Sequence, residues 1–349
     1  MLALAGLPLG HSFVFFDASP SSATQGLGDL IQGDFDDAAA LTAFARQCDV
    51  VTYEFENVPC NAASVIAQHT TVYPPPRALA VSQDRVIEKE YLQSLGISVP
   101  AFRAVSSEQE LRDACASLGT PCIVKTRRLG YDGKGQARIS SMDDVPEAWQ
   151  SLGSAPLIVE AHVPFSRELS VIAVRSSLGH IKTYPLACNV HRSGILHRSE
   201  IPAPNISQST AQEAHSLVSK VLNDLQYVGV IAIELFDVGG HLVANEIAPR
   251  VHNSGHATID GSMTSQFENH IRAITDMSLG SVVSRAPAVM YNLVGSTPEP
   301  SLVASIANAK LHLYGKSPRP GRKLGHVTLL NPSPDDERAL ESLVHGEAR

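Results

Sequence analysis

The chain has 349 residues, of which 44% are hydrophobic and 18% are charged, and its formal net charge is −8. Such a composition supplies ample material for a core, the length favours roughly two to three domains, and the acidic balance argues against a nucleic-acid-binding scaffold. The longest apolar stretches are too short to span a bilayer, and the first residues lack the basic flank of a signal peptide. The five cysteines are scattered and form no CxxC pair, which favours reduced thiols in the cytoplasm.

Residues 1–83 alternate between strand-like and helical patterns. In this stretch the patterns predict strands at 11–17, 49–54 and 71–73 and helices at 2–7, 36–47 and 61–69. Alternation of this kind predicts a parallel sheet whose carboxyl edge carries a ligand site. Glu54 and Glu56 would lie at that edge, either as part of the site or only as polar ends of a strand.

A new unit begins with a helix expected over residues 84–94, for which Asp84 is a suitable N-cap. Arg85 lies in the first turn of this helix, where a cation opposes the helix dipole and gains nothing locally. This position indicates either that Arg85 faces an anionic partner or that it is simply solvated.

The segment 121–136, PCIVKTRRLGYDGKGQ, starts as a strand and continues as a glycine-rich loop. Closely spaced glycines let backbone N–H groups approach an anion such as a phosphate, and Lys125 and Lys134 would add positive charge. The spacing is neither that of a P-loop nor that of a Rossmann fingerprint. From these residues alone, a phosphate-binding loop and an ordinary glycine-rich hairpin are both open.

Two strands are expected at 156–163 and 167–175, after a helix near 143–149. Alternation along the second strand places Glu168 on the same face as Ser170. An apolar strand that ends beside a carboxylate could hold an adenine ring and bind its ribose. The alternative is that these glutamates are ordinary surface residues.

Two alternating strands within residues 229–250 flank Gly239-Gly240, which predicts a β-hairpin. A three-residue loop that includes His241 would place Glu234 directly opposite Glu246. A two-residue loop would put the two glutamates on opposite faces of the hairpin. We expect the three-residue loop, because it places two polar side chains of otherwise apolar strands opposite each other, where they can bind the same ligand.

Two facing carboxylates repel each other unless a cation lies between them. Oxygen ligands favour Mg²⁺, and Asn245 beside Glu246 could add a neutral oxygen. Removing one of the two facing carboxylates is expected to relieve this repulsion in the metal-free protein. Glu246→Gln should therefore abolish turnover, leave the fold intact and leave the melting temperature without Mg²⁺ equal or higher.

The polar segment that follows contains His252 and His256, whose spacing would suit zinc on a helix. Gly255 and the preceding Asn-Ser pair make a helix improbable. A polar loop that follows Arg250 suits contacts with substrate or phosphate better.

Near the C-terminus, strands are expected at 288–293 and 326–330. The segment between them contains a basic stretch stiffened by prolines, with Lys316, Arg319, Arg322 and Lys323. Such a loop suits a phosphomonoester, and a solvated run of charges is the alternative.

These segments together resemble the ATP-grasp ligases, and within them the N5-carboxyaminoimidazole ribonucleotide synthase family. The resemblance is most specific at GYDGKGQ (130–136), NEIAPRVHNSGH (245–256) and KSPRPGRK (316–323). It implies a fold of mixed α/β and α+β character, the ATP-grasp fold. The implied domains are a Rossmann-like N-terminal domain at 1–83, an ATP-grasp domain at 84–289 with a lid at about 121–160, and a small β-rich C-terminal domain at 290–349.

The resemblance also implies a reaction. The family uses ATP to phosphorylate bicarbonate, and the carboxyphosphate passes its carboxyl group to the exocyclic amine of 5-aminoimidazole ribonucleotide, giving ADP and phosphate in purine biosynthesis. The implied ligands are ATP, Mg²⁺, bicarbonate and this ribonucleotide, with no nucleic acid or membrane partner. The implied enzyme is a cytoplasmic homodimer.

The matching motifs carry the family's residue roles onto this chain. The implied catalytic residues are Lys125, Asp132, Arg250 and Lys316. The implied ATP contacts are Arg85, Lys125, Gly130, Tyr131, Asp132, Gly133, Lys134, Gly135, Gln136, Glu160, Ala161, His162, Val163, Glu168, His191, Asn245 and Glu246. The implied substrate contacts are Glu54, Tyr131, Asn253, Ser254, His256, Lys316, Arg322 and Lys323, and the implied magnesium ligands are Glu234 and Glu246. Among the basic residues, Lys316 and Arg322 are the first choices for a phosphate.

Three other functions are open. The chain could be another ATP-grasp ligase, such as a formate-dependent transformylase or a biotin-type carboxylase. It could be a metal-dependent hydrolase built on His252, His256 and Glu246, or a nucleotide-binding protein without catalysis.

The front of the chain departs from the family pattern. Family members begin with an apolar strand and a glycine-rich turn ending in Gly-Arg-Met, whereas this sequence begins at the methionine. We therefore expect that Met1 is not the natural start or that the chain is truncated. The strands at 11–17 and 49–54 are then expected to have unpaired edges.

Overall fold

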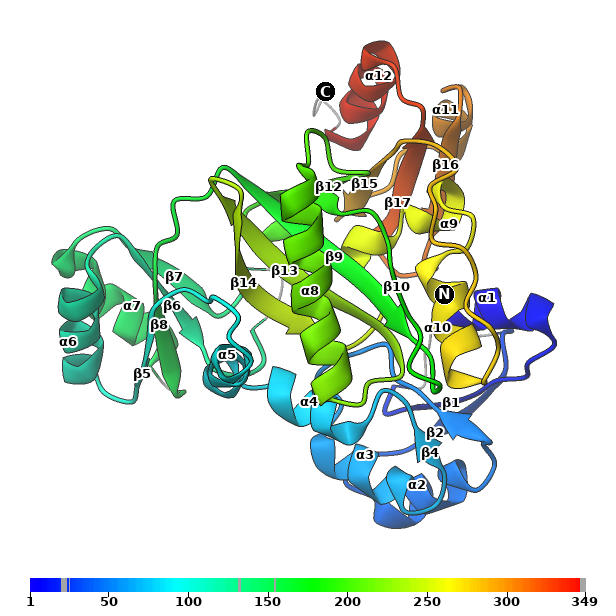
Figure 1. The fold of residues 1–349 in the computed structure, drawn as a ribbon, viewed down its shortest axis with the longest axis horizontal. Coiled ribbons are helices and arrows are strands. Elements are labelled where there is room, and N and C mark those ends of the chain that lie inside the picture. The colour runs from blue at the N-terminus through cyan, green and yellow to red at the C-terminus, as the bar shows by residue number, and fades with distance from the viewer. Residues whose placement is uncertain (20–23, 25, 131–132, 154, 346–349) are drawn as a thin grey trace.

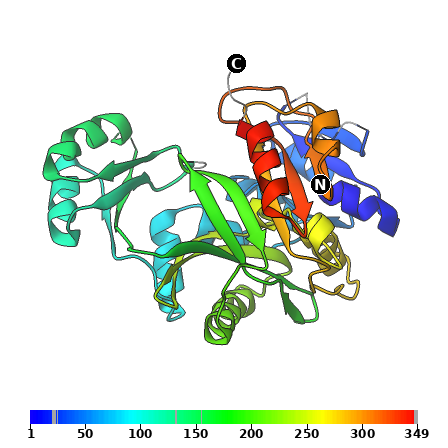
Figure 2. The ribbon, with the colours of Figure 1, turned by 90° about the horizontal axis from the view of Figure 1, so that it is seen from above.

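The computed structural model describes residues 1–345 except 20–23, 25, 131, 132 and 154. Figure 1 shows a large sheet at the centre, with most of the N-terminal elements below it, the first helix at its right and the C-terminal elements at its upper right. A small lobe, here called the lid lobe and formed by residues 102–161, lies at the left. Figure 2, turned by 90°, again shows this lobe projecting from one side of the molecule.

The N-terminal part contains two separate parallel strand pairs rather than one continuous sheet. β1 pairs with β2 and β3 pairs with β4, and the bounds are β1 (Val14–Asp17), β2 (Asp29–Gln32), β3 (Val50–Val51) and β4 (Thr71–Val72). The helices are α1 (Leu2–Gly6), α2 (Ala38–Ala45), α3 (Cys60–Ala67) and α4 (Pro76–Ser82). The expected strands exist but are shorter, and the sequence patterns missed β2 and α4, which are short and have weak periodicity.

Helix α5 (Arg85–Ser94) leads from this part to the lid lobe and begins where the sequence predicted. The side chain of Asp84 accepts hydrogen bonds from the backbone N–H groups of Val86 and Ile87, which confirms it as the N-cap. The same carboxylate binds the guanidinium of Arg127 at 2.9 and 3.0 Å. The cap therefore also fixes the segment that enters the glycine-rich loop.

The lid lobe is a four-stranded antiparallel sheet in the order β5-β8-β6-β7. Its strands are β5 (Phe102–Val105), β6 (Cys122–Thr126), β7 (Gln136–Ile139) and β8 (Leu157–Ala161), and its helices are α6 (Glu108–Leu118) and α7 (Val145–Leu152). Leu111, Val124 and Val159 pack together in a core of its own. The glycine-rich segment joins β6 to β7, so it is the connection of an antiparallel pair.

The central sheet has nine strands, in the order β14-β13-β9-β11-β12-β15-β17-β16 with β10 beside β9. The first group of strands is β9 (Arg167–Arg175), β10 (Ile181–Thr183), β11 (Ala187–Arg192), β12 (Ile195–Ile201), β13 (Gly229–Val238) and β14 (His241–Ala248). β9 has the bounds that its alternating pattern predicted. The long helix α8 (Gln208–Asp224) lies across this sheet in Figure 1.

The C-terminal strands continue this sheet instead of forming a separate one. β15 (Ala288–Val294) pairs with β12, and β16 (Ala309–Leu313) and β17 (Lys323–Leu330) extend the edge. The expected domain boundary at 290 therefore falls inside β15. The remaining helices are α9 (Thr258–Gly261), α10 (Gln266–Ile274), α11 (Pro300–Ala304) and α12 (Pro334–His345), and 3₁₀ turns lie at Leu7–Leu9, Met142–Asp144 and Asn253–Gly255.

The two faces of the central sheet have different covers. Along β9, Leu169 and Val171 pack in the cluster that contains α8, whereas Ile172 and Val174 pack with α10. Alternation puts Glu168 on the same face as Ile172, farther along the strand. Thus α10 covers the apolar half of this face, and the polar half is left for a ligand.

The hairpin of β13 and β14 differs from the prediction in its loop. Val238 pairs with His241, so the loop has only the two glycines, whose φ angles of 63° and 93° suit a tight turn. A β-bulge then shifts the register, and Glu234 nevertheless lies opposite Glu246. The expected three-residue loop was wrong, and the expected pairing of the glutamates was right.

The bulge changes the face of Glu246. Leu242 and Ala244 point into the core under α8, and with regular alternation Glu246 would follow them. One extra residue, Asn245, resets the alternation, so Glu246 shares the face of Ala248, which packs with α10. β-bulges commonly re-aim side chains in this way next to active sites.

Among the residues the structure describes, no helix combines the length and apolar character that crossing a membrane requires.

Candidate active site

A cavity of about 700 Å³ lies where the N-terminal part, the lid lobe, the central sheet and the C-terminal strands meet. Four segments that are far apart in the sequence contribute to its wall: the glycine-rich loop, the β13–β14 hairpin, the segment 250–256 and the basic segment 314–323. The fold thus brings together the stretches that the sequence singled out separately.

The two facing glutamates lie in this wall with different partners. Glu246 forms an ion pair of 2.9 Å with Arg85, whose Nη2 also lies 3.4 Å from the carbonyl oxygen of Gly130. Burial alone would raise the pKa of Glu246, but Arg85 outweighs it and lowers the pKa to about 2. Burial and the charge of Glu246 raise the pKa of Glu234 to about 7.

Arg85 therefore has the anionic partner that its unusual position suggested. It also overturns the expectation that loss of Glu246 relieves repulsion. Because Arg85 already neutralises Glu246, removing that carboxylate would leave a largely buried cation unpaired. Among the described residues, no lysine or arginine forms an ion pair with Glu234, whose nearest basic side chain is His252 at 3.6 Å.

The donor set around Glu234 fits a hard cation such as Mg²⁺. The two carboxylates face each other, and the buried Oδ1 of Asn245 has no hydrogen-bond partner in the described part of the chain. Its Nδ2 lies 3.5 Å from Glu234, so the amide oxygen is the atom left for a ligand. Carboxylate and amide oxygens that leave positions open for phosphate oxygens are typical of magnesium sites.

The described residues contain no group of three or more His, Cys, Asp or Glu side chains that could hold a metal ion. This bears on the hydrolase alternative. His252 lies 3.6 Å from Glu234, whereas Nδ1 of His256 contacts the hydroxyl of Tyr314 and the amide of Asn253 instead. The geometry therefore gives no support to a zinc site on these two histidines.

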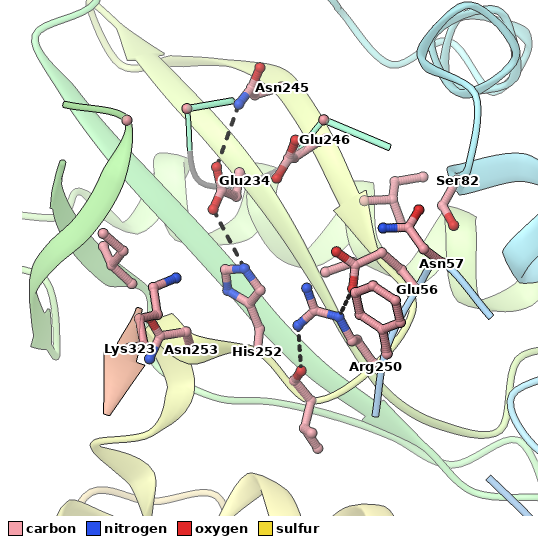
Figure 3. A pocket seen from close by; sticks show the side chains of 18 of the residues that line it. Glu56, Asn57, Ser82, Glu234, Asn245, Glu246, Arg250, His252, Asn253 and Lys323 are labelled. Atoms are coloured by element: carbon pink, nitrogen blue, oxygen red, sulfur yellow. Dashed lines mark hydrogen bonds and ion pairs between the residues drawn. The ribbon is translucent and has the colours of Figure 1, made fainter. Parts of the chain in front are cut away.

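Figure 3 shows Glu234 between Asn245 and His252. The backbone N–H of Ser254 lies 3.4 Å from Nδ1 of His252, which leaves Nε2 to carry the proton toward Glu234. Burial and the charge of Arg250 lower the pKa of His252 to about 3. His252 is thus a neutral hydrogen-bond donor at neutral pH.

Arg250 points into the same region and is ion-paired with Glu56 from the N-terminal part. The hydrogen bonds of Gln266 to both backbone groups of His252 hold this loop in place. Glu54, the neighbour of Glu56, also lines the cavity, and its carboxylate accepts a hydrogen bond from the N–H of Leu2.

Lys125 reaches the cavity from the lid strand β6. Its Nζ lies 2.8 Å from Glu160, which is also ion-paired with Lys89 on α5 at 3.2 Å. Burial would raise the pKa of Glu160, but the two lysines lower it to about 2. Lys89 also donates to the carbonyl oxygen of Asn245, so this buried cluster joins the lid lobe to the bulge.

On the central sheet, Nδ1 of His191 lies 2.5 Å from Glu168. Burial would lower the pKa of His191, but the contact with Glu168 raises it on balance. Nearby, the rings of Phe165 and Phe236 stack at 4.7 Å and 8°. Both rings line the cavity, and neither was singled out from the sequence because isolated phenylalanines carry no distinctive pattern.

The basic segment contributes two of its cations to the wall, Lys316 and Lys323. Arg322 does not line the cavity, and its guanidinium donates to the carbonyl oxygen of Ser317 at 3.1 Å. Burial and the charge of Arg322 lower the pKa of Lys316. Figure 3 shows Lys323 beside Asn253.

The cavity wall contains most of the residues implied by the resemblance. Those in the wall are Glu54, Arg85, Lys125, Gly130, Gly133, Lys134, Gln136, Glu168, His191, Glu234, Asn245, Glu246, Arg250, Asn253, His256, Lys316 and Lys323. Those outside it are Gly135, Glu160, Ala161, His162, Val163, Ser254 and Arg322. Tyr131 and Asp132 lie outside the described residues. The wall also contains Asn57 and Ser82, which the sequence did not propose. Glu56 and His252 lie in it too; the sequence offered Glu56 only as a possible site residue at the sheet edge and His252 only for the hydrolase alternative.

Three family models match the chain in succession. Residues 1–83 match the ribonucleotide synthetase preATP-grasp domain, residues 90–267 match the ATP-grasp domain, and residues 288–340 match the phosphoribosylaminoimidazole carboxylase C-terminal domain. The chain is 45% identical to N5-carboxyaminoimidazole ribonucleotide synthase of Pseudomonas aeruginosa over 329 residues, covering 94% of this chain and 91% of that protein. Identity to the same enzyme of Brucella melitensis is also 45%, covering 95% and 93%.

Solved structures of the same enzyme are similar throughout. The crystal structure from Thermus thermophilus has a TM-score of 0.94 at 44% identity, covering 100% of this chain and 96% of that one. The Aspergillus clavatus structure, in complex with ADP and 5-aminoimidazole ribonucleotide, has a TM-score of 0.90 at 32% identity, covering 99% and 94%.

Glu234→Gln is expected to stabilise the protein at pH 8 in the absence of divalent cations. The pKa of Glu234 is raised from 4.5 to about 7, so its proton stabilises the folded state fully below about pH 4.5, and this contribution is lost as the pH rises through about 7. An amide cannot ionise, so the variant does not lose this contribution. Between pH 4.5 and pH 8, its free energy of unfolding should therefore rise by roughly 2–3 kcal/mol relative to that of the native protein. Urea unfolding at both pH values measures the difference.

Glu246→Gln is the matched control. It removes the partner of Arg85, so it should lower the melting temperature at both pH 5 and pH 8. Destabilisation by Glu234→Gln at pH 8, or stabilisation by Glu246→Gln, would contradict these charge assignments.

Proposed function

The chain belongs to the N5-carboxyaminoimidazole ribonucleotide synthase family of ATP-grasp ligases, and on this basis we propose how its own residues perform the carboxylation of 5-aminoimidazole ribonucleotide. The enzyme uses ATP and bicarbonate and releases ADP and phosphate, in purine biosynthesis. The observation that carries the proposal is the convergence of the glycine-rich loop, the carboxylate hairpin and the basic segment on one cavity.

ATP binds between the lid lobe and the central sheet. The stacked rings of Phe165 and Phe236 provide an apolar surface for the adenine, and Glu168 accepts hydrogen bonds from the ribose. Lys125 and the backbone of the glycine-rich loop bind the phosphates. Lys125 is held by Glu160, so its ammonium group is positioned before the nucleotide arrives.

Mg²⁺ would be held by Glu234, Glu246 and Asn245 together with phosphate oxygens, and when bound it would neutralise charge on the phosphates. Arg85 keeps Glu246 ionised, so this carboxylate can bind a cation without first losing a proton. Glu234 must lose its proton to become a ligand. Cation binding at this hairpin should therefore strengthen as the pH rises through about 7.

The ribonucleotide and bicarbonate occupy the other end of the cavity. Lys316 and Lys323 bind the phosphomonoester. Arg250, whose orientation is fixed by Glu56, and the neutral donor His252 lie between this end and the metal ligands. There they can bind the oxygens of bicarbonate and stabilise negative charge as the carboxyphosphate forms.

The lid lobe excludes water from this unstable intermediate. It is a separate antiparallel sheet with its own core, and it reaches the central sheet through the cluster of Lys125, Glu160 and Lys89. A lobe of this kind can move as a unit, and closure over the nucleotide would shield the reacting groups. We also retain the homodimer and the cytoplasmic location as proposals.

In an assay of ADP release, full rate is expected to need both 5-aminoimidazole ribonucleotide and bicarbonate, because the carboxyphosphate and its acceptor meet in one cavity. Each small substrate is omitted in turn, and the loss of rate is measured. Strong stimulation by glycinamide ribonucleotide with formate, and none by aminoimidazole ribonucleotide, would move the protein to another branch of the ATP-grasp ligases.

Lys316→Ala and Lys323→Ala are each expected to raise the KM for the ribonucleotide and leave the KM for ATP nearly unchanged. Each loses a charge-assisted contact that contributes roughly 1.5–3 kcal/mol to binding. Arg322→Ala is the matched control, because its guanidinium lies outside the cavity wall. An effect of Arg322→Ala as large as the other two would place the phosphate on the outer side of the segment.

A further inference from the structure

We propose that Asn292, which does not line the cavity, is a positioning residue that fixes the tautomer of His256 through the amide of Asn253. In this tautomer His256 presents an Nε2–H to the substrate end of the cavity, where it donates to an anionic oxygen of the substrate. The inference rests on the proposed function for the identity of that substrate. The tautomer itself does not depend on it.

The chain of hydrogen bonds starts at a group that can only accept. The carbonyl oxygen of Leu196 on β12 accepts from Nδ2 of Asn292 on β15 at 2.8 Å. This contact fixes which end of the Asn292 amide carries the hydrogens. The side chain is 1% exposed, so exchange of this bond for one with bulk water is not available.

The second link is a reciprocal pair of amides. Nδ2 of Asn292 donates to Oδ1 of Asn253 at 2.7 Å, and Nδ2 of Asn253 donates to Oδ1 of Asn292 at 2.9 Å. Flipping Asn253 alone would bring oxygen against oxygen and N–H₂ against N–H₂. Its orientation therefore follows from that of Asn292.

The third link sets the histidine. The remaining N–H of Asn253 points at Nδ1 of His256, 3.1 Å away. Nδ1 must accept this hydrogen bond, so the ring proton is on Nε2. The hydroxyl of Tyr314 lies 3.0 Å from the same nitrogen and 2.8 Å from Nδ1 of His326. Because both neighbours of the ring lie at Nδ1 and His256 lines the cavity, Nε2 is the nitrogen that the proposal assigns to the cavity side.

The ring is held neutral by its surroundings. Burial and the neighbouring His326 lower the pKa of His256 well below its usual value. The donor therefore keeps the same strength over the pH range in which the enzyme would work. Lys316 and Lys323 line the same end of the cavity, which makes an anionic oxygen the group that this N–H would meet.

The test is a measurement of the imidazole nitrogens in the full-length protein labelled with ¹⁵N-histidine, with His256→Asn used to assign the signals. In the native protein, Nδ1 of His256 is expected to be unprotonated and Nε2 protonated, without change from pH 6 to 9. A protonated Nδ1, or a mixture of tautomers in the native protein, would overturn the proposal. This arm needs no variant of Asn292 to fold.

In Asn292→Leu, which has a similar shape but no amide, the His256 signals are expected to move to those of a tautomer mixture. Thr328→Val is the control, because Thr328 is a fully buried polar residue of the same sheet. It lies on β17, whereas Asn292 lies on β15. The hydrogen bonds from Leu196 through Asn292 and Asn253 to His256 are called the relay below. Unchanged His256 signals in a folded Asn292→Leu protein would show that Asn292 does not set the tautomer.

Kinetic measurements distinguish the role of the His256 Nε2–H from the role of Asn292 in setting the tautomer. Asn mimics Nδ1 of a histidine and Gln mimics Nε2, so His256→Gln should retain more activity than His256→Asn. Loss of one hydrogen bond to an anion corresponds to roughly 10- to 100-fold in kcat/KM for the ribonucleotide, expected for His256→Asn with the KM for ATP unchanged. Asn292→Leu should lose about two- to tenfold, since part of its population keeps the Nε2–H.

If the two His256 variants are equally impaired, the Nε2–H is not the group that meets the substrate, and the proposal fails even when the tautomer is as expected. If the native protein shows no turnover with aminoimidazole ribonucleotide and bicarbonate, the proposed function fails instead, and the nitrogen signals still decide the relay.

Discussion

The ion pair between Arg85 and Glu246 connects the parts of the molecule that form the cavity. Arg85 belongs to the first turn of α5, Glu246 to the bulged strand β14, and the other arm of the guanidinium reaches the carbonyl of Gly130 in the glycine-rich loop. The two residues of the ion pair are 161 positions apart in the sequence. Without this contact, a cation at a helix N-terminus and a half-buried carboxylate would each be unfavourable.

The same ion pair gives different pKa values to two glutamates that look alike in the sequence. Glu246 remains ionised with its pKa near 2, whereas Glu234 has its pKa near 7 and can hold or release a proton at physiological pH. A cation at this hairpin would compete with one proton rather than with two. The arrangement would link the binding of a cation at this hairpin to a single protonation step.

Neutral histidines recur around the cavity. Burial lowers the pKa of His252 and of His326 to about 3 and that of His256 well below its usual value. A buried ring that does not take up a second proton provides one donor and one acceptor, and its neighbours decide which nitrogen is which. Uncharged polar side chains such as Ser254 and Asn253 therefore influence the site through their contacts with Nδ1 of His252 and of His256.

The sequence by itself determined the features that depend on neighbours along the chain. The N-cap at Asp84, the bounds of β9 and the position, though not the length, of the turn at Gly239-Gly240 were predicted from local backbone and side-chain preferences, and the matching motifs identified the family. The tertiary structure decided the features that depend on distant segments. The bulge at Asn245 changes the face of Glu246, and only the contact of β14 with its neighbours reveals this, because a shift of one residue exchanges the two faces of a strand. The partner of Arg85, the retreat of Arg322 from the cavity wall and the relay from Asn292 to His256 likewise join residues whose proximity no local pattern records.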